Sequence, residues 1–265
     1  NMYYTKKGTG SPILLIHDTL PGASGYEWSK IEDELAIDHT VYTVDLLGCG
    51  RSDKSSITYT NFVYVQMISD FIKKIIGQKT DVIASGFSGS FVTMACHNEK
   101  ELFNKIMLVN PPSLTQLKQM PNRKDRLLKA ALEIPIFGTL VYHMIVSRDN
   151  INNLFIEKMY YNPFHVDNQM ADAYYEAAHK GGYYTRFLYS SLAAKYININ
   201  ICHALKALDN SIYIVEGETE PNGKAVTDDY CASNPAIEVS VLKETKHLPH
   251  VEAPEAFLEQ VKIFF

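Results

Sequence analysis

Short apolar runs recur over the first 112 residues, and segments with helical spacing lie between them. The runs are Pro12–His17, Val41–Asp45, Asp81–Ala84 and Ile106–Val109. Runs of this kind are typical of strands buried on both faces of a parallel sheet. Segment Tyr64–Ile76 carries apolar residues at helical spacing, Gly77 is placed to end it, and Phe91–Cys96 is a second helical stretch. This alternation predicts an α/β fold with a doubly wound, mostly parallel sheet.

The strand pattern stops after residue 112. From Ser113 to about Asn210 the chain has no convincing buried strand and instead has helix-like stretches. These stretches are Asp125–Leu132, Asn152–Tyr161, Asn168–His179 and Thr185–Ala194. We therefore expect residues 113–210 to form a helical insertion.

Apolar runs return at Ser211–Val215 and Ile237–Leu242, and a helical segment that begins with proline, Pro254–Phe265, ends the sequence. We expect a core domain made of residues 1–112 and 211–265, with 113–210 inserted as a cap. Ligand sites in such sheets lie beyond the carboxyl ends of the strands. The insertion would therefore act as a lid over the site.

Tyrosine is concentrated in the predicted cap. Eight of the 17 tyrosines lie between residues 151 and 200: Tyr160, Tyr161, Tyr174, Tyr175, Tyr183, Tyr184, Tyr189 and Tyr196. One interpretation is that they pack the cap onto the core. The other is that some of them line an apolar pocket and offer hydroxyl groups to a ligand.

The charge and composition of the chain give no indication of a nucleic-acid partner or of a membrane span. The chain has 265 residues, a net charge of −5 and no basic run, so nothing indicates nucleic-acid binding. No apolar run approaches the roughly 18 residues of a membrane span, and the first residues lack the regions of a signal peptide. The cysteines form no C-x-x-C pair and are expected to be free thiols in a cytoplasmic protein: Cys49, Cys96, Cys202 and Cys231.

Polar and small residues cluster where the predicted strands end. The clusters are His17-Asp18-Thr19, the segment from Asp45 to Asp53, the segment from Ala84 to Ser90, the segment from Gly217 to Pro221, and the segment from His247 to Glu255. Gly48-Cys49-Gly50 lacks the third glycine of a dinucleotide-binding loop. We therefore expect no cofactor.

In this order the clusters resemble the α/β-hydrolase superfamily, in its cap-bearing branch of esterases, epoxide hydrolases, dehalogenases and C–C hydrolases. The resemblance covers roughly residues 12–112 and 211–265. It implies a nucleophile on a sharp strand-to-helix turn, an acid and a histidine, in that chain order. His247 is then the general base and Glu220 the acid that orients it, with Glu218 as a rival for the acid. His250 follows His247 by three residues, but no third ligand is nearby and we expect no metal.

The nucleophile position is unusual. The segment Gly86–Ser90 fits a small-x-Ser-x-small frame centred on Ser88, whereas Ala84–Ser88 fits the same frame centred on Gly86. Counting from the flanking strands favours Gly86, because a frame centred on Ser88 leaves the following segment two residues short. A glycine supplies no attacking atom but relieves the backbone strain of the turn. Aspartate is absent from this turn, which argues against enzymes that attack with a carboxylate.

The other parts of the implied site depend on backbone groups. The resemblance implies an oxyanion hole made by the backbone N–H groups of Phe87 and Thr19, which a glycine at position 86 need not remove. Asp18 stands where the family commonly has glycine, and its charge would oppose an oxyanion there. The alternative for Asp18 is a turn residue that faces solvent or caps a backbone N–H. The alternative for Ser88 is a packing or capping residue at the start of the next helix.

Three functions fit these residues. The first is hydrolysis of a small ester, thioester or amide-like substrate by His247 and Glu220, with Ser88 or water as the attacking group. The second is a catalytically inactive protein that binds a small apolar ligand. The third is a lyase or cofactor-independent oxygenase in which the histidine and the acid move protons. A variant in which glycine replaces a serine at position 86 also fits. The sequence leaves the substrate and the oligomeric state open.

Overall fold

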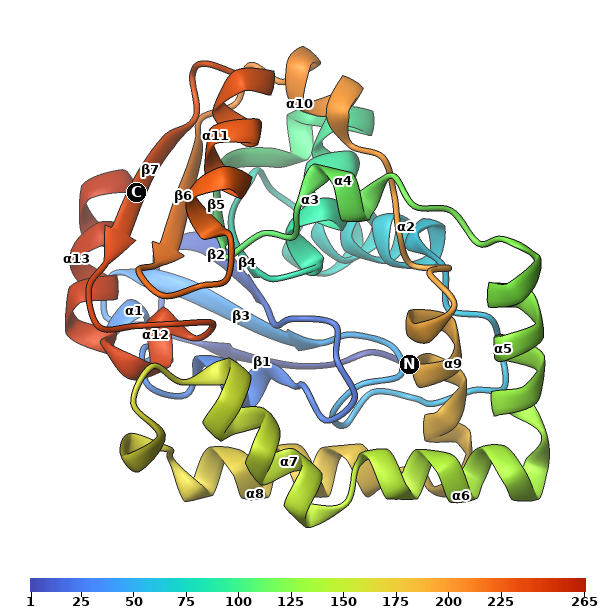
Figure 1. Cartoon of the computed structure of the whole chain (residues 1–265). Helices are drawn as coiled ribbons and strands as arrows, with labels where there is room; N and C mark the ends of the chain where they lie inside the picture. The colour runs from blue at the N-terminus through green and yellow to red at the C-terminus, as the bar shows by residue number, and fades with distance from the viewer.

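The computed structural model describes residues 1–265, and its centre is one seven-stranded sheet (Figure 1). The strands are β1 (Tyr3–Lys7), β2 (Ser11–Ile16), β3 (His39–Asp45), β4 (Thr80–Ser85), β5 (Phe103–Val109), β6 (Ile212–Gly217) and β7 (Glu238–Leu242). They lie in the order β1-β3-β2-β4-β5-β6-β7, and only β1 is antiparallel to its neighbour. The doubly wound, mostly parallel sheet predicted from the apolar runs is confirmed. β1 was not predicted, because its residues alternate in exposure at the sheet edge and form no apolar run.

Helices cover both faces of the sheet. The α-helices before the insertion are α1 (Glu32–Leu35), α2 (Asn61–Phe71) and α3 (Ser88–Asn98), and those after it are α11 (Gly223–Ser233), α12 (Pro249–Glu252) and α13 (Pro254–Phe264). Short 3-10 helices span Gly25–Trp28 (η1) and Lys100–Leu102 (η3). Helix α2 continues as one π-helical segment, η2 (Ile72–Ile76), and ends at Gly77 with φ of 75°. The end predicted at Gly77 is therefore observed.

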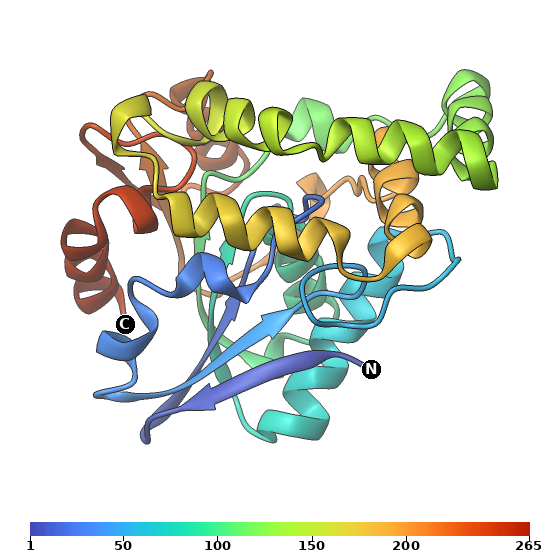
Figure 2. The same cartoon turned by 90° about the horizontal axis from the view of Figure 1, so that it is seen from below.

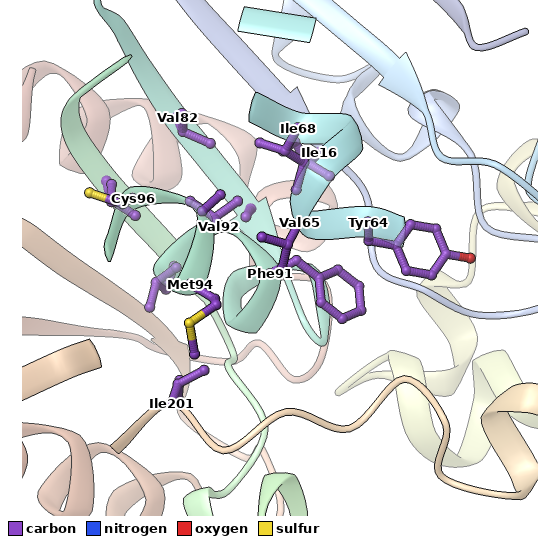
Figure 3. Packing of buried hydrophobic residues seen from close by; sticks show 14 of the residues in the cluster. Ile16, Tyr64, Val65, Ile68, Val82, Phe91, Val92, Met94, Cys96 and Ile201 are labelled. Carbon is purple, nitrogen blue, oxygen red and sulfur yellow. The ribbon is translucent and has the colours of Figure 1, made fainter. Parts of the chain in front are cut away.

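The side chains of β2 show that each face of the sheet packs against its own layer of helices. Leu14 and Ile16 point into one hydrophobic cluster, which they form with α2 and α3. Ile13 and Leu15 point into a second cluster on the opposite face, together with residues of η1 and α13. Successive side chains of a strand point to opposite faces, so a strand buried on both sides is apolar at every position. In Figure 3, side chains of α2 and α3 interdigitate over the sheet in the first cluster.

Only helices connect β5 to β6. They are α4 (Leu114–Leu117), α5 (Arg123–Glu133), α6 (Pro135–Ile145), α7 (Arg148–Leu154), η4 (Phe155–Met159), η5 (Pro163–His165), α8 (Asn168–His179), η6 (Gly182–Tyr184), α9 (Thr185–Ala193) and α10 (Cys202–Ala207). Several of them lie across one end of the sheet (Figure 2). The inserted helical region is confirmed, while the domain boundaries at 112 and 211 stay predictions. No single helix is long and apolar enough to cross a membrane.

A third hydrophobic cluster joins the cap to the core. It contains residues of α6, α7 and α8 together with three residues of the core, which are Ala23 and Leu248 from loops and Val251 from α12. Tyr160 and Tyr174 are buried in it, as expected for tyrosines that pack the cap. The cap therefore rests on the loop that follows β2 and on the segment that contains His247.

Candidate active site

The turn between β4 and α3 contains Gly86. Its φ of +53° lies in the left-handed region, which side chains other than glycine rarely adopt. Its N–H donates to the Val109 carbonyl at 2.9 Å, so the turn is tied to β5. Helix α3 begins two residues later at Ser88. Gly86 thus lies on a sharp strand-to-helix turn at the carboxyl end of the sheet.

The Asp18 carboxylate fills the space above Gly86. A Cβ atom built on Gly86 would lie 2.2 Å from Asp18 Cγ and 2.3 Å and 2.5 Å from its two carboxylate oxygens. The register of the sheet explains this proximity, because Ile16 of β2 pairs with Ala84 of β4 and both residues in question follow two positions later. The carboxylate therefore occupies the place that a side chain at position 86 would take.

Asp18 also binds both backbone groups that the sequence assigned to an oxyanion hole. Its Oδ1 accepts hydrogen bonds from Thr19 N at 2.6 Å and from Phe87 N at 2.8 Å. Asp18 is buried, so these bonds compensate a charge that water does not reach well. Both sequence interpretations hold in part, because Asp18 caps two backbone N–H groups and its carboxylate lies where an oxyanion would bind. The expectation that Asp18 faces solvent is wrong, since the residue is buried. A carbonyl oxygen can reach these donors only if the carboxylate leaves.

His247 lies between two carboxylates. Its Nε2 is 3.3 Å from Asp18 Oδ2, and its Nδ1 is 3.3 Å from Glu220 Oε1. Glu220 lies in the turn after β6, and His247 precedes α12. The rival acid Glu218 is exposed, and its Oε2 instead accepts a hydrogen bond from Glu244 N. The structure thus brings Asp18, His247 and Glu220 into one row.

Asn110 holds the two loops of this row together, a role that the sequence analysis did not assign. It has a φ of 43°, and its side-chain amide donates to the carbonyls of Lys246 at 2.8 Å and His247 at 2.9 Å. Its Oδ1 accepts a hydrogen bond from Gly217 N. The asparagine at the end of β5 is the signal that identifies it, because asparagine tolerates the left-handed region.

The charges of the row determine the protonation of His247. Burial lowers the pKa of His247, but the hydrogen bonds and negative charges of Asp18 and Glu220 outweigh burial and raise that pKa to about 10. At neutral pH the ring is therefore an imidazolium that donates to both carboxylates. An imidazolium cannot take a proton from water, so the resting site does not hold a general base.

None of the three serines near the turn forms a hydrogen bond with His247. Ser88 Oγ donates to the His17 carbonyl at 2.6 Å and lies 3.0 Å from Thr19 Oγ1, and the residue is fully buried. Ser90 Oγ donates to the Phe87 carbonyl. Ser85 Oγ is buried without a hydrogen-bond partner. The hydrogen bonds of Ser88 are those of a packing and capping residue, and His247 makes its own bonds to Asp18 and Glu220.

Glu27 and His250 form a second buried contact between an acid and a histidine, next to Asp18. Glu27 and His250 are fully buried, and His250 Nε2 lies 3.2 Å from Glu27 Oε1. Burial raises the pKa of Glu27, but the nearby imidazoles of His250 and His17 outweigh burial, so the pKa lies below its usual value. Glu27 Oε2 accepts hydrogen bonds from Asp18 N and from the hydroxyl of Tyr174 on α8. No sequence pattern pointed to Glu27.

A cavity of about 270 Å³ opens beside this row. Gly86, Asp18, His247 and Glu220 border it, and α4 and α11 contribute polar side chains, of which Gln116 is one. No tyrosine lines it, so the cap tyrosines offer no hydroxyl group to this cavity. The cavity is large enough for a small organic molecule and bordered mainly by polar groups.

Comparison with known proteins finds relatives that match part of the chain. A 2-hydroxy-6-oxo-6-(2'-aminophenyl)hexa-2,4-dienoic acid hydrolase of Metapseudomonas resinovorans is 29% identical over 113 residues, 42% of this chain and 39% of that protein. A soluble epoxide hydrolase of Corynebacterium sp. (strain C12) is 25% identical over 109 residues, 41% of this chain and 37% of that protein. The matched stretches span about two fifths of the length of these relatives.

Similar solved structures cover the whole chain. A serine hydrolase involved in carbazole degradation superposes with a TM-score of 0.82 at 17% identity, over 99% of this chain and 93% of that one. The epoxide hydrolase CorEH superposes with a TM-score of 0.80 at 17% identity, over 100% and 94% of the two chains. At this identity the likeness concerns the fold alone. The sequence model of the alpha/beta hydrolase family, however, matches residues 13–260, and the chain therefore belongs to that family.

Proposed function

We propose that this chain is a hydrolase in which the Asp18 carboxylate makes the attack that position 86 cannot make. One observation carries the proposal: Asp18 Oδ1 accepts hydrogen bonds from Thr19 N and Phe87 N, while Oδ2 faces His247. One oxygen is therefore fixed by backbone donors and the other is directed along the row. A carboxylate held in this way is a suitable nucleophile for a saturated carbon.

The raised pKa of His247 supports one class of substrate. An attack that needs a base is unfavourable in the resting site, because the pKa of His247 is raised to about 10. A carboxylate attacks an epoxide or an alkyl halide without a base. Asp18 Oδ2 forms a bond to carbon, and the bond from that carbon to the halide or to the epoxide oxygen breaks. The halide leaves as an anion, and an epoxide oxygen takes a proton from solvent water.

The second step, hydrolysis of the ester formed on Asp18, uses the same three residues with Asp18 and His247 uncharged. Esterification removes the charge of Asp18, so the pKa of His247 falls and the ring loses its proton to solvent. Neutral His247 then takes a proton from water, and the resulting hydroxide attacks Asp18 Cγ. The negative charge develops on Oδ1, where Thr19 N and Phe87 N already lie. The intermediate collapses by breaking the bond between Asp18 Cγ and the alkoxide oxygen, and the alkoxide takes a proton from His247 and leaves as the alcohol. The proton left on the Asp18 carboxyl group then passes to His247, which restores the carboxylate and the imidazolium.

Hydrolysis of a small ester or related acyl substrate is the second candidate. The Glu220–His247 contact favours it, since an acid that orients a histidine is the arrangement used for acyl transfer. The attacking group would be water, since position 86 is glycine and Ser88 is bonded to His17. This route requires Asp18 to leave both backbone donors before a carbonyl oxygen can bind them.

An isotope experiment distinguishes the two routes. The full chain is incubated with small aryl epoxides, bromoalkanes and p-nitrophenyl esters in water enriched in oxygen-18, and the peptide that contains Asp18 is analysed by mass spectrometry. Attack by Asp18 places the heavy oxygen in the Asp18 carboxylate. Direct attack by water places it only in the product. Turnover of an epoxide or a bromoalkane with no label in that peptide would refute the role of Asp18.

Two substitutions provide the control. Asp18→Ala should abolish turnover of epoxides and bromoalkanes, because the attacking oxygen is gone. Asp18→Gly should instead increase ester hydrolysis if the second candidate is correct, because both backbone donors become free and His247 loses one carboxylate. Circular dichroism of both variants checks that the fold is retained.

A further inference from the structure

The outer corner of the cap exposes a set of large apolar side chains. Helices α5 and α6 meet there at a bend of 96° (Figure 1). Exposure of these side chains ranges from 44% at Leu128 to 86% at Ile136. The set is Leu127, Leu128, Ile134, Ile136, Phe137, Leu140 and Met144, and we call the segment from Arg123 to Ile145 the cap corner. These seven residues lie within 18 positions on two adjoining helices, whereas exposed apolar residues that need no explanation are scattered singly.

The backbone of the cap corner is braced from inside. A Cβ atom on Gly138 would lie 1.8 Å from the Leu132 carbonyl oxygen, so glycine allows α6 to pass close to the end of α5. The buried Arg186 donates to the carbonyl of Glu133 at 3.3 Å and to Thr139 Oγ1 at 3.2 Å. The apolar side chains are therefore held outward by a fixed turn.

The exposed charges of α5 are all positive. Arg123, Lys124 and Arg126 are exposed, in a chain whose net charge is −5. The two carboxylates of the helix face inward instead. Asp125 pairs with Lys195, and Glu133 pairs with Lys129 at 2.5 Å. The cap corner thus presents apolar side chains beside three cations with no exposed anion on the same helix.

We propose that the cap corner binds the surface of an anionic lipid bilayer. Apolar side chains of α6 would enter the boundary between headgroups and acyl chains, and the three cations of α5 would contact lipid phosphates. No single helix is long and apolar enough to cross a membrane, and α5 and α6 pass that test only together, as a pair bent by 96°. Because this bend prevents one straight span, we expect both helices to lie on the membrane surface. A second copy of the chain fits the surface less well. A two-fold contact through this patch would bring the three cations toward their own copies.

Vesicle sedimentation of the full chain tests the proposal. We expect co-sedimentation with vesicles of mixed phosphatidylcholine and phosphatidylserine, and roughly 100-fold weaker partition onto phosphatidylcholine alone, because each cation near an anionic surface contributes about 1 kcal/mol. The triple variant Arg123→Gln, Lys124→Gln, Arg126→Gln should remove that preference for the anionic vesicles. Raising the salt concentration should weaken binding in the same way.

A second pair of variants separates the apolar contribution. Ile136→Asp with Leu140→Asp should abolish binding to both kinds of vesicle. Ile263→Asp is the matched control, because Ile263 on α13 is 73% exposed and lies outside the cap corner; it should bind like the unmodified chain. Absence of co-sedimentation overturns the proposal. So does a dimer in light scattering that Ile136→Asp dissociates, since the partner would then be a second copy.

Discussion

Introducing serine at position 86 should fail to create an esterase unless Asp18 is removed as well. A serine Cβ at Gly86 would lie 2.2 Å from Asp18 Cγ, whereas ordinary contacts begin near 3.4 Å. The carboxylate must then move by about 1 Å, which breaks its bonds to Thr19 N and Phe87 N. In Gly86→Ser alone, the Asp18 carboxylate therefore blocks the position from which the serine hydroxyl would attack.

The structure sets the approximate size of the effect. Each hydrogen bond to the carboxylate contributes about 1.5–3 kcal/mol, and a serine at φ of +53° adds strain on the order of 1 kcal/mol. Gly86→Ser should reduce the free energy of unfolding by roughly 4 kcal/mol, because water in the cavity partly replaces the lost bonds. Asp18→Gly removes the clash, so the double variant should be more stable than Gly86→Ser alone by about 2 kcal/mol.

Urea unfolding and p-nitrophenyl ester hydrolysis measure the two parts of this prediction. The double variant Asp18→Gly, Gly86→Ser should hydrolyse the ester at least about tenfold faster than either single variant, because it combines a hydroxyl group, free backbone donors and His247. A fluorophosphonate should label position 86 in the double variant and leave Ser88 unlabelled. The reasoning is refuted if Gly86→Ser alone is as stable and as active as the double variant.

Three further predictions concern the row of charges. Asp18→Asn should lower the pKa of His247 from about 10 by at least about one unit, as followed by NMR titration of the ring, because one of its two carboxylates is lost. Because the pKa of His247 is higher in the folded state, protonation of His247 stabilises the fold; this contribution is complete below about pH 6.5 and is lost as the pH rises toward 10. The midpoint of urea unfolding should therefore fall between these two pH values, and it should fall less in Asp18→Asn. His247→Gln should accumulate one equivalent of alkylated protein with an epoxide or bromoalkane, seen as added mass on intact protein, and a product burst without added mass would contradict attack by Asp18.

The sequence determined most of the framework because its signals are local. Strands buried on both faces must be apolar at every position, and the runs that begin near Pro12 and Asp81 coincide with β2 and β4. Helix α8 has the bounds that its periodicity predicted. Helix α6 was missed, because apolar residues cover its exposed face as well as its buried one and leave no polar stripe.

Only the tertiary structure decided what stands above Gly86. No spacing in the sequence relates Asp18 to position 86, because 67 residues separate them along the chain. The parallel register of β2 and β4 pairs Ile16 with Ala84 and so brings the two turns together. Aspartate is absent from the turn itself, yet the neighbouring strand delivers a carboxylate to the same place. The sequence by itself therefore identified a position without a nucleophile, and strand pairing placed Asp18 there in contact with His247.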